Sequence, residues 1–313
     1  MPDRSAPPAG AAEQYKPVSV LAGAPPWLEM RGITKVYPNG TRALDNVDLV
    51  VAKGEIHGLL GENGAGKSTL MKILSGILPL TSGRIFLGGR EVSLRSTDEA
   101  LAHGIGMVHQ HFSLVPTFNA LDNIILGRGA LLSRPARAAA RARIQRLMEE
   151  TGLHAPLDVP VEHLPVGTQQ RIEILKTLDR KVDLLILDEP TAVLTPQETD
   201  QLFTVLRGLS ARGTTIILIT HKLREVLALT NAVTVLRNGR VVGSRETQGA
   251  TAQDLARMMV GAERLPEVKA RREHGKAEPV LRVAGLTVKG DEGQAAVKNV
   301  SFEIHRGEIF AIA

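Results

Sequence analysis

Short apolar runs alternate with helix-like segments over much of this chain. Runs at Glu55–Leu60, Asp183–Leu187 and Thr214–Thr220 have the length and aliphatic content of buried strands. The segments Ser68–Leu74 and Pro196–Leu209 space their apolar residues as helices do. Strands that alternate with helices usually pair in parallel, so the pattern predicts an α/β fold with a largely parallel sheet and helices on both faces.

The stretch from about residue 90 to residue 180 departs from this alternation, because its pattern is mostly helical. An arginine-rich helix is expected to begin at Ser133-Arg134-Pro135 and to end at Thr151-Gly152, since proline suits a first helical turn and glycine a helix end. We interpret this stretch as an inserted helical subdomain.

The two ends of the chain differ from its middle. Residues 1–26 are rich in Ala, Pro and Gly without a hydrophobic period, which predicts a disordered N-terminal extension. A folded domain is expected over residues 27–262. Residues 263–279 are charged and poor in strand formers, as is typical of a linker.

Residues 280–313 repeat the beginning of the folded domain at a constant offset of 253 positions, as from Leu28 to Leu281. About ten of 33 overlapping positions are identical without a gap. The last residue of the repeat, Ala313, aligns with Leu60. We therefore expect residues 280–313 to be the truncated start of a second copy of the domain.

Composition narrows the class of protein. No cysteine is present, which excludes disulfide frameworks and thiolate zinc sites. No run reaches the roughly 18 to 20 apolar residues of a membrane span, and the N-terminus does not resemble a secretory leader, so a soluble cytoplasmic chain is expected.

The net charge of +5 is concentrated in one stretch, because Asn123–Met148 holds no acidic residue. These arginines would form a solvated helix face, contact a membrane-protein loop or acidic lipid, or meet nucleic-acid phosphates. The six arginines of this stretch are Arg128, Arg134, Arg137, Arg141, Arg143 and Arg146.

A glycine-rich loop with the pattern Gly-x-x-x-x-Gly-Lys-Ser follows the apolar run that ends at Leu60. Between a strand and a helix this pattern binds phosphate, because its backbone N–H groups turn toward phosphate oxygens and the helix dipole favours negative charge. Lys67 offsets β- and γ-phosphate charge, Ser68 can ligate Mg²⁺ and Thr69 can reach the α-phosphate. The predicted ATP-binding residues of the loop are Gly61, Asn63, Gly64, Ala65, Gly66, Lys67, Ser68 and Thr69.

Two acidic residues, Asp188 and Glu189, end the apolar run Leu184–Leu187. Ligands bind open α/β sheets at the carboxyl ends of strands, which is where this pair would lie. Asp188 suits the Mg²⁺ shell, and Glu189 can face the γ-phosphate and polarise water as a general base.

Three more side chains are candidates. His221 follows the run Thr215–Thr220, where an imidazole could contact the γ-phosphate, although such a histidine on its own is more often a cap or surface residue. Gln110 follows Ile105–His109, where a neutral amide could contact Mg²⁺ or the attacking water. Tyr37 precedes the turn Pro38-Asn39-Gly40, and its ring would either stack on adenine, contributing about 1 to 3 kcal/mol, or lie on the surface.

From about Leu28 to Gly261 the order and spacing of these motifs resemble those of the nucleotide-binding subunits of ABC transporters. The resemblance implies a P-loop NTPase fold of the ABC ATPase type, with an antiparallel β subdomain beside the core sheet, and ATP and Mg²⁺ as ligands. It assigns family roles to the candidates: adenine-stacking Tyr37, the Walker A loop Gly61–Thr69, the Q-loop glutamine Gln110, the Walker B aspartate Asp188, the catalytic glutamate Glu189 and the switch histidine His221. The implied catalytic residues are Glu189, His221, Gln110 and Lys67, and the implied Mg²⁺ ligands are Ser68, Gln110 and Asp188.

The family's signature, usually Leu-Ser-Gly-Gly-Gln, has an altered form here. Its place is taken by Leu164-Pro165-Val166-Gly167-Thr168, which departs from the pattern at three of five positions. Pro165 removes a hydroxyl and a backbone N–H where the family's serine helps hold the γ-phosphate. Thr195 likewise replaces the aspartate of the D-loop.

In this family two halves sandwich ATP head to tail, so each phosphate loop meets the signature of the other half. Gly61–Ser68 would face a second half or, in a homodimer, another copy of this chain. The altered signature would serve the phosphate loop of that partner. With a second half we therefore expect one competent ATP site and one weakened site, whereas in a homodimer each phosphate loop would face a Pro165-bearing signature.

The sequence around the signature, Val166–Leu178, and the sequence after Asp188 are similar to those of the ATPase subunits of bacterial importers of simple sugars and nucleosides. These subunits carry two fused halves. The resemblance implies ATP hydrolysis that powers import of a nucleoside or a simple sugar. The implied partners are separate transmembrane permease subunits and, indirectly, a periplasmic or lipid-anchored substrate-binding protein, with the chain at the cytoplasmic face of the membrane and no nucleic-acid partner.

The alternative is a soluble twin-ABC protein that acts on ribosomes or nucleic acid. It would explain the arginines. Such proteins join their halves by a long helical linker, whereas roughly 18 residues separate Gly261 from Val280 here. Their DNA-repair relatives need cysteine zinc sites, which this chain lacks.

Overall fold

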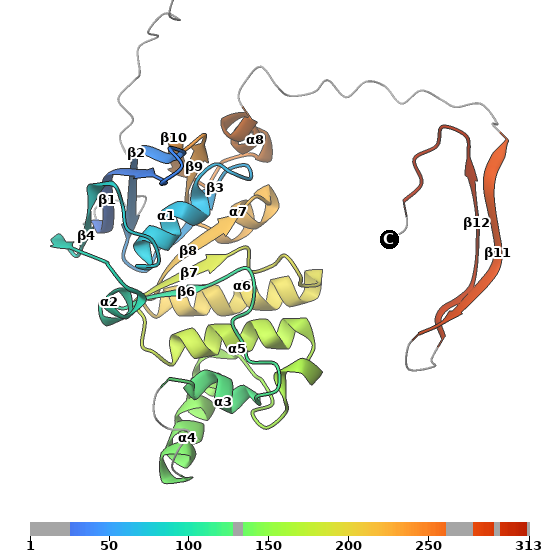
Figure 1. Ribbon diagram of the computed structural model, residues 1–313, viewed down its shortest axis with the longest axis horizontal. Coiled ribbons are helices and arrows are strands. Elements are labelled where there is room, and N and C mark those ends of the chain that lie inside the picture. The colour runs from blue at the N-terminus through green and yellow to red at the C-terminus, as the bar shows by residue number, and fades with distance from the viewer. Residues whose placement is uncertain (1–25, 128–133, 261–277, 291–294, 312–313) are drawn as a thin grey trace, which may run out of the picture. The chain divides into compact units, whose positions relative to one another are not determined.

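The computed structural model of the protein describes residues 26–127, 134–260, 278–290 and 295–311 (Figure 1). The chain divides into two compact units, Met1–Leu265 and Pro266–Ala313. The expected N-terminal extension lies outside the described residues apart from Pro26, and the expected linker does so apart from Glu278 and Pro279.

A six-stranded sheet forms the core of the first unit, with the strand order β10-β9-β3-β8-β7-β6. All neighbours in it pair in parallel except β9 and β10. Its strands are β3 Ile56–Leu60, β6 Ile105–Val108, β7 Leu184–Asp188, β8 Thr215–Thr220, β9 Ala232–Arg237 and β10 Arg240–Glu246. The largely parallel sheet expected from the sequence is confirmed.

The central strands are buried on both faces, which explains why they read as continuous apolar runs rather than as alternating ones. Every residue of β7 and β8 is buried. Along β7, Leu184 and Ile186 join one hydrophobic cluster, while Leu185 and Leu187 join the cluster on the opposite face. The carboxyl ends of β3, β7 and β8 therefore lie side by side at one edge of a rigid sheet.

A second, four-stranded sheet has the order β2-β1-β4-β5, and all of its neighbours pair antiparallel. Its strands are β1 Pro26–Val36, β2 Arg42–Ala52, β4 Ser82–Leu87 and β5 Arg90–Val92. Its inward residues, among them Leu28 and Leu49, pack in one cluster with α1 and the core sheet. This sheet is the antiparallel β subdomain that the family resemblance implies.

The helices lie on both sides of the core sheet, with α3 and α4 beyond α5 as seen from the sheet (Figure 1). None of the helices in the described ranges is long and apolar enough to cross a bilayer. The helical segments are α1 Lys67–Leu74, α2 Thr97–Ala102, α3 Ala120–Ile125, α4 Arg134–Thr151, the 3-10 helix η2 Val161–His163, α5 Val166–Leu178, α6 Pro196–Ala211, α7 Leu223–Leu229 and α8 Ala252–Val260.

The helical subdomain begins later in the chain than the sequence indicated. Strand β6 pairs in parallel with β7, so Ile105–Val108 belongs to the core sheet, and the short strand β5 belongs to the antiparallel sheet. The expected start near residue 90 was therefore wrong. A four-residue strand next to several helices leaves too short an apolar run for its pairing to be recognised.

Helix α4 carries five of the six arginines, and Arg128 lies outside the described residues. Arg137 pairs with Asp122 and Arg141 with Asp158. Arg143 makes two hydrogen bonds to Asp179, at 2.7 and 3.0 Å. Three arginines thus fasten α4 to its own subdomain, and their charge is not wholly available to an outside partner.

The second unit is an antiparallel hairpin of β11 Pro279–Lys289 and β12 Ala295–His305. Its register repeats that of β1 and β2 at the same offset, as in the pairs Leu281–Ile304 and Leu28–Val51, or Val283–Phe302 and Met30–Leu49. Asn299 has φ of 49°, as Asn46 has 51°. The sequence repeat is thus also a repeat of backbone conformation.

One face of the hairpin carries exposed apolar side chains. Leu281 and Leu286 are 47% and 41% exposed, whereas the equivalent Leu28 and Ile33 are fully buried in the first unit. The residues described in the second unit do not supply the cover that α1 and β4 give to the first copy.

Candidate functional site

The glycine-rich loop connects the carboxyl end of β3 to the first turn of α1, as its motif requires. Gly66 has φ of 104°, and a Cβ there would lie 2.8 Å from the carbonyl oxygen of Ala43. A Cβ on Gly61 would overlap the carbonyl oxygen of Leu236. Only glycine fits both positions, so packing of the loop against its neighbours fixes a curve that presents backbone N–H groups.

The ammonium group of Lys67 lies inside this curve. It donates hydrogen bonds to the carbonyl oxygens of Gly61 at 2.7 Å and Glu62 at 2.9 Å. Burial lowers the pKa of Lys67, while the nearby carboxylates of Glu189 and Asp188 oppose that change. A buried cation beside N–H donors is a strong attractor for phosphate oxygens.

Asp188, at the end of β7, is 8% exposed and accepts a hydrogen bond from Ser68. Burial raises the pKa of Asp188, with Ser68 and Lys67 acting in the opposite direction. Hydroxyl and carboxylate oxygens are the ligands that Mg²⁺ prefers. The pair joined at this point therefore fits a magnesium ion, which would supply the positive charge that a buried carboxylate lacks.

Glu189 and His221 meet across the edge between β7 and β8. Nδ1 of His221 donates to Oε1 of Glu189 over 2.8 Å. Glu189 has φ of 48°, a conformation that L-residues rarely adopt, and its backbone N–H donates to the carbonyl oxygen of Ile219 at 2.9 Å. Strained backbone of this kind is frequent where a catalytic side chain must be aimed.

A cavity of about 370 Å³ collects most of the predicted site residues. Among the predicted ATP-binding residues, Gly61 and Tyr37 do not line it, and neither does the predicted catalytic His221, which hydrogen-bonds to the lining residue Glu189. Sequence reasoning did not identify Ala43, whose carbonyl oxygen packs against Gly66 of the loop. The lining residues are Ala43, Asn63, Gly64, Ala65, Gly66, Lys67, Ser68, Thr69, Gln110, Asp188 and Glu189.

Tyr37 is half-buried beside the loop. Its hydroxyl lies 3.3 Å from Oγ1 of Thr69, and Lys35 Nζ lies 5.6 Å from its ring centroid. The turn behind it is closed by a hydrogen bond from Gly40 N–H to the Tyr37 carbonyl at 2.9 Å. The ring is thus held at the end of the loop where Thr69 stands.

The altered signature lies at the start of α5, away from the loop cavity. Pro165 is exposed and is the N-cap residue of α5, and its carbonyl accepts from the N–H groups of Thr168 at 2.9 Å and Gln169 at 3.1 Å. Val166 is 43% exposed, while Leu164 is buried. Within the described residues, α5 has no side-chain hydrogen bond from its N-cap residue.

Thr195, which stands in the D-loop position, begins α6 with a capping box. Its hydroxyl accepts from the Glu198 N–H at 3.3 Å, and the Glu198 carboxylate accepts from the Thr195 N–H at 2.9 Å. A Cβ on Gly167 would overlap that carboxylate. The signature glycine and the start of α6 are therefore in close contact.

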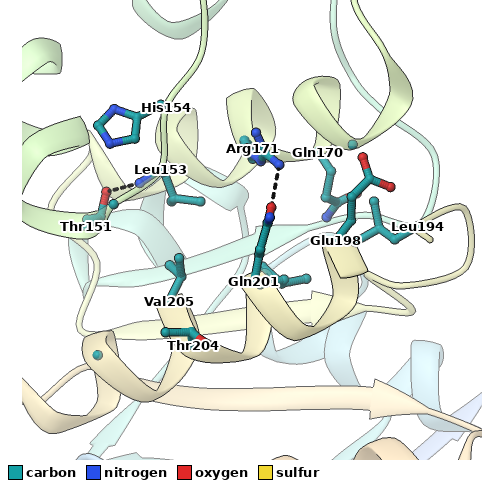
Figure 2. A pocket seen from close by; sticks show the side chains of 14 residues that line it. Thr151, Leu153, His154, Gln170, Arg171, Leu194, Glu198, Gln201, Thr204 and Val205 are labelled. Atoms are coloured by element: carbon teal, nitrogen blue, oxygen red, sulfur yellow. Dashed lines mark hydrogen bonds between the residues drawn. The ribbon is translucent and has the colours of Figure 1, made fainter. Parts of the chain in front are cut away.

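A second cavity, of about 420 Å³, lies between α5 and α6 (Figure 2). Arg171 donates to Gln201 over 3.0 Å at its edge, and Leu153, Leu202 and Val205 line it. The amide nitrogen of Gln170 is buried and has no hydrogen-bond partner within the described part of the chain. Its lining contains neither a lysine nor a glycine-rich loop, so this cavity does not suit triphosphate.

Sequence reasoning missed the polar cluster behind Glu189 and His221. Thr191, Thr220 and Glu225 are all buried, and both threonine hydroxyls donate to the Glu225 carboxylate. The available signal was the position of these residues, since Thr191 follows Glu189 by two residues and Glu225 follows His221 by four. A threonine and a glutamate at such spacings are too common to single out without the fold.

Comparison with known proteins gives a consistent result. Residues 44–192 match the family described as ABC transporter. A glucose import ATP-binding protein of Haloferax volcanii is 45% identical, over 92% of this chain and 57% of its own length. A nucleoside import ATP-binding protein of Lactococcus lactis is 43% identical, over 91% of this chain and 56% of its own length. The chain thus spans little more than half the length of these relatives.

Solved structures agree with the fold. A cassette of Clostridium perfringens that is part of an ABC transporter complex has a TM-score of 0.64 and 28% identity, over 74% of this chain and 93% of its own. A bacterial ABC transporter cassette solved in a dimeric structure has a TM-score of 0.61 and 25% identity, over 71% of this chain and 100% of its own. The matched folds extend over the unit that holds the loop cavity.

Proposed function

Because this chain belongs to the ABC transporter family of ATP-binding cassettes, we propose that it binds and hydrolyses ATP to power the import of a nucleoside or a simple sugar. The observation that carries the proposal is the cavity at the carboxyl ends of β3 and β7. It brings Lys67, the Ser68–Asp188 pair and Glu189 together, with His221 hydrogen-bonded to Glu189 at 2.8 Å.

The loop would bind ATP through its triphosphate. Asn63–Gly66 and Lys67 line the cavity, where backbone N–H groups of the loop and the Lys67 ammonium would neutralise phosphate charge. Thr69 lies at the α-phosphate end, next to Tyr37, whose ring would stack on the adenine. Magnesium bound by Ser68, Gln110 and Asp188 would neutralise charge on the β- and γ-phosphate oxygens.

Glu189 is the general base of the proposed reaction. Water attacks the γ-phosphorus, its proton passes to the Glu189 carboxylate, and the bridging oxygen leaves with ADP. The Nδ1–H of His221 fixes one carboxylate oxygen of Glu189 at 2.8 Å, and the ring can then turn its other nitrogen toward the γ-phosphate. Gln110, which is exposed at the cavity, would orient the water.

The site needs a second cassette to close over the nucleotide. A second half in the same longer protein fits both the coverage of the relatives, 57% and 56% of their lengths, and the repeated strand register. A homodimer of this chain is the other arrangement. With a fused second half the Pro165-bearing signature would serve one site and leave it weaker, because it lacks the serine hydroxyl, whereas in a homodimer it would serve both sites.

Transport would take place in other subunits. Permease subunits would span the membrane and a substrate-binding protein would deliver the solute, while this cassette would stay at the cytoplasmic face. Two similar proteins are a glucose import and a nucleoside import ATP-binding protein, which supports both solute classes.

An uptake assay tests the proposal. In cells that lack the gene, uptake of radiolabelled nucleosides and simple sugars is compared with uptake after reintroducing the full-length gene or its Glu189→Gln form. We expect one solute class to lose uptake, the wild-type gene to restore it and the variant to fail. Unchanged uptake together with ribosome co-sedimentation of the protein would favour the twin-ABC alternative.

The structure offers that alternative little support. The basic stretch was the main sequence feature in favour of the twin-ABC alternative. However, three arginines of α4 are paired with Asp122, Asp158 and Asp179. A nucleic-acid surface needs cations free to neutralise phosphates.

A further inference from the structure

A buried carboxylate lies behind the proposed catalytic pair and takes no part in the chemistry described so far. Glu225 stands in the first turn of α7 and is 7% exposed. A carboxylate this deeply buried must be compensated by hydrogen bonds and an opposite charge.

Three donors reach the two oxygens of Glu225. Oε1 accepts from the Thr191 hydroxyl at 2.5 Å and from Lys222 Nζ at 3.0 Å. Oε2 accepts from the Thr220 hydroxyl at 3.1 Å. Thr191 and Thr220 are themselves 2% and 1% exposed, so both contacts are shielded from water.

The donors belong to two different loops. Thr191 follows Glu189 by two residues, while Thr220 and Lys222 stand on either side of His221. Lys222 strengthens the connection by donating to the Thr191 carbonyl at 3.0 Å, and the Lys222 N–H donates to the Thr220 hydroxyl at 3.0 Å. Glu225 therefore joins the loop of the general base to the loop of the switch histidine.

We propose that Glu225 is a positioning residue that holds the His221 loop against the Glu189 loop and so maintains their 2.8 Å hydrogen bond. The inference rests on the proposed function, because it assigns a role within that reaction. Glu225 contacts neither the cavity lining nor the reacting atoms in this role.

A carboxylate suits the task better than an amide. It only accepts, so it can hold two hydroxyls and an ammonium group at once, whereas a glutamine must turn an N–H₂ group toward one of these donors. Replacement by alanine removes all three contacts and replacement by glutamine removes the ion pair with Lys222. The effect of Glu225→Ala should therefore exceed that of Glu225→Gln.

Kinetics and binding separate positioning from nucleotide binding. In the full-length protein with its second cassette we expect Glu225→Ala to lower kcat about tenfold or more, since small displacements of catalytic groups have large effects on rate. ATP affinity, measured by titration calorimetry, should stay within about twofold, because the phosphate loop is untouched. Glu225→Gln should have an intermediate kcat.

Nuclear magnetic resonance of the histidine rings gives a readout that does not require turnover. The His221 signal, assigned by its loss in His221→Gln, should report a protonated, hydrogen-bonded Nδ1 in the wild type. It should shift in Glu225→Ala in the same direction as in Glu189→Gln. The matched control is Val226→Ala on the same helix, which loses buried apolar volume and should lower stability without shifting His221.

The inference is overturned if Glu225→Ala leaves kcat unchanged or lowers kcat and ATP affinity in parallel. It is also overturned if the His221 signal has the same position in Glu225→Ala as in the control Val226→Ala. Failure of the proposed function looks different. In that case the wild-type protein would not hydrolyse ATP at all, while the His221 signal would still show whether Glu225 holds the two loops together.

Discussion

At the scale of single residues, the loop cavity concentrates charged groups that folding has partly removed from water. Lys67 has a lowered pKa and Asp188 a raised one, and burial is the first cause of both shifts. Burial thus makes the charged form of each group less stable than it would be in solution. The proposed ligands bring the opposite charge, phosphate for Lys67 and Mg²⁺ for Asp188, and would relieve this cost, which would tie binding to stability.

Asp188→Asn should stabilise the ligand-free protein at neutral pH. An acid with a raised folded-state pKa favours folding while protonated, and that contribution is lost as pH rises from the ordinary value of 3.8 through the raised pKa. We expect a higher Tm than wild type at pH 7 and no difference below about pH 4. A lower Tm at pH 7 would contradict this assignment.

Asp45→Asn is a useful control because the expected change in Tm at pH 7 has the opposite sign. Hydrogen bonding to Arg240 lowers the pKa of Asp45, so this substitution should lower Tm slightly at pH 7. Addition of Mg²⁺ and ATP should raise the Tm of the wild type and of Asp45→Asn far more than that of Asp188→Asn.

Tyr37→Ala should weaken ATP binding by about 1 to 3 kcal/mol, which is the usual contribution of a base stacked on an aromatic ring. Tyr37→Phe keeps the ring and should stay within about threefold of the wild type. Inorganic tripolyphosphate carries no base, so titration with it should give equal affinities for all three proteins. Equal ATP affinities would place the adenine elsewhere.

At the scale of elements, the residues of the candidate site lie at the ends of helices and strands, while the residues along their lengths form the stabilising core. The Arg143–Asp179 pair joins α4 to the end of α5, and the Asp179 side chain is only 1% exposed. The capping box of Thr195 and Glu198 begins α6 directly beside the signature glycine Gly167. Both contacts therefore join helix ends within the helical part of the unit.

Arg143→Ala should destabilise the protein by about 1 to 3 kcal/mol, because it withdraws two hydrogen bonds from a buried carboxylate. Arg146→Ala on the same helix replaces an exposed arginine and should stay within about 0.5 kcal/mol. Urea unfolding measures both. Equal effects of the two substitutions would show that the Arg143–Asp179 pair does not anchor α4.

Pro165→Ser should raise ATP turnover of the two-cassette protein by up to about tenfold, since a hydrogen bond to a charged phosphate contributes roughly 1.5 kcal/mol or more. The serine would also cap α5, which has no side-chain cap now. Pro165→Ala is the matched control, because it supplies neither hydroxyl nor cap. Unchanged turnover in Pro165→Ser would mean that this signature does not limit hydrolysis.

At the scale of the whole chain, features encoded locally were the ones that the sequence predicted. The loop Gly61–Ser68 and the strand end at Asp188 are continuous motifs, and their placement on the parallel sheet follows from the alternation of elements. The repeat was also readable, because Leu281 and Leu28 share both sequence and register.

Several features that depend on distant contacts were not predicted. Strand β6 is too short to be recognised without β7, which pairs with it about 80 residues later. The arginines of α4 looked free because Asp122, Asp158 and Asp179 lie outside the helix. Glu225 became visible only when the fold brought Thr191 and Thr220 to it.

The most direct test of ATP hydrolysis at this cavity is the steady-state turnover of the full-length protein carrying Glu189→Gln, with ATP binding measured in parallel. Glutamine keeps the size of the side chain but cannot take a proton from water. We expect kcat to fall about 100-fold or more, with ATP affinity retained. Turnover equal to that of the wild type would contradict the assignment of Glu189 as the base and, with it, the proposed mechanism.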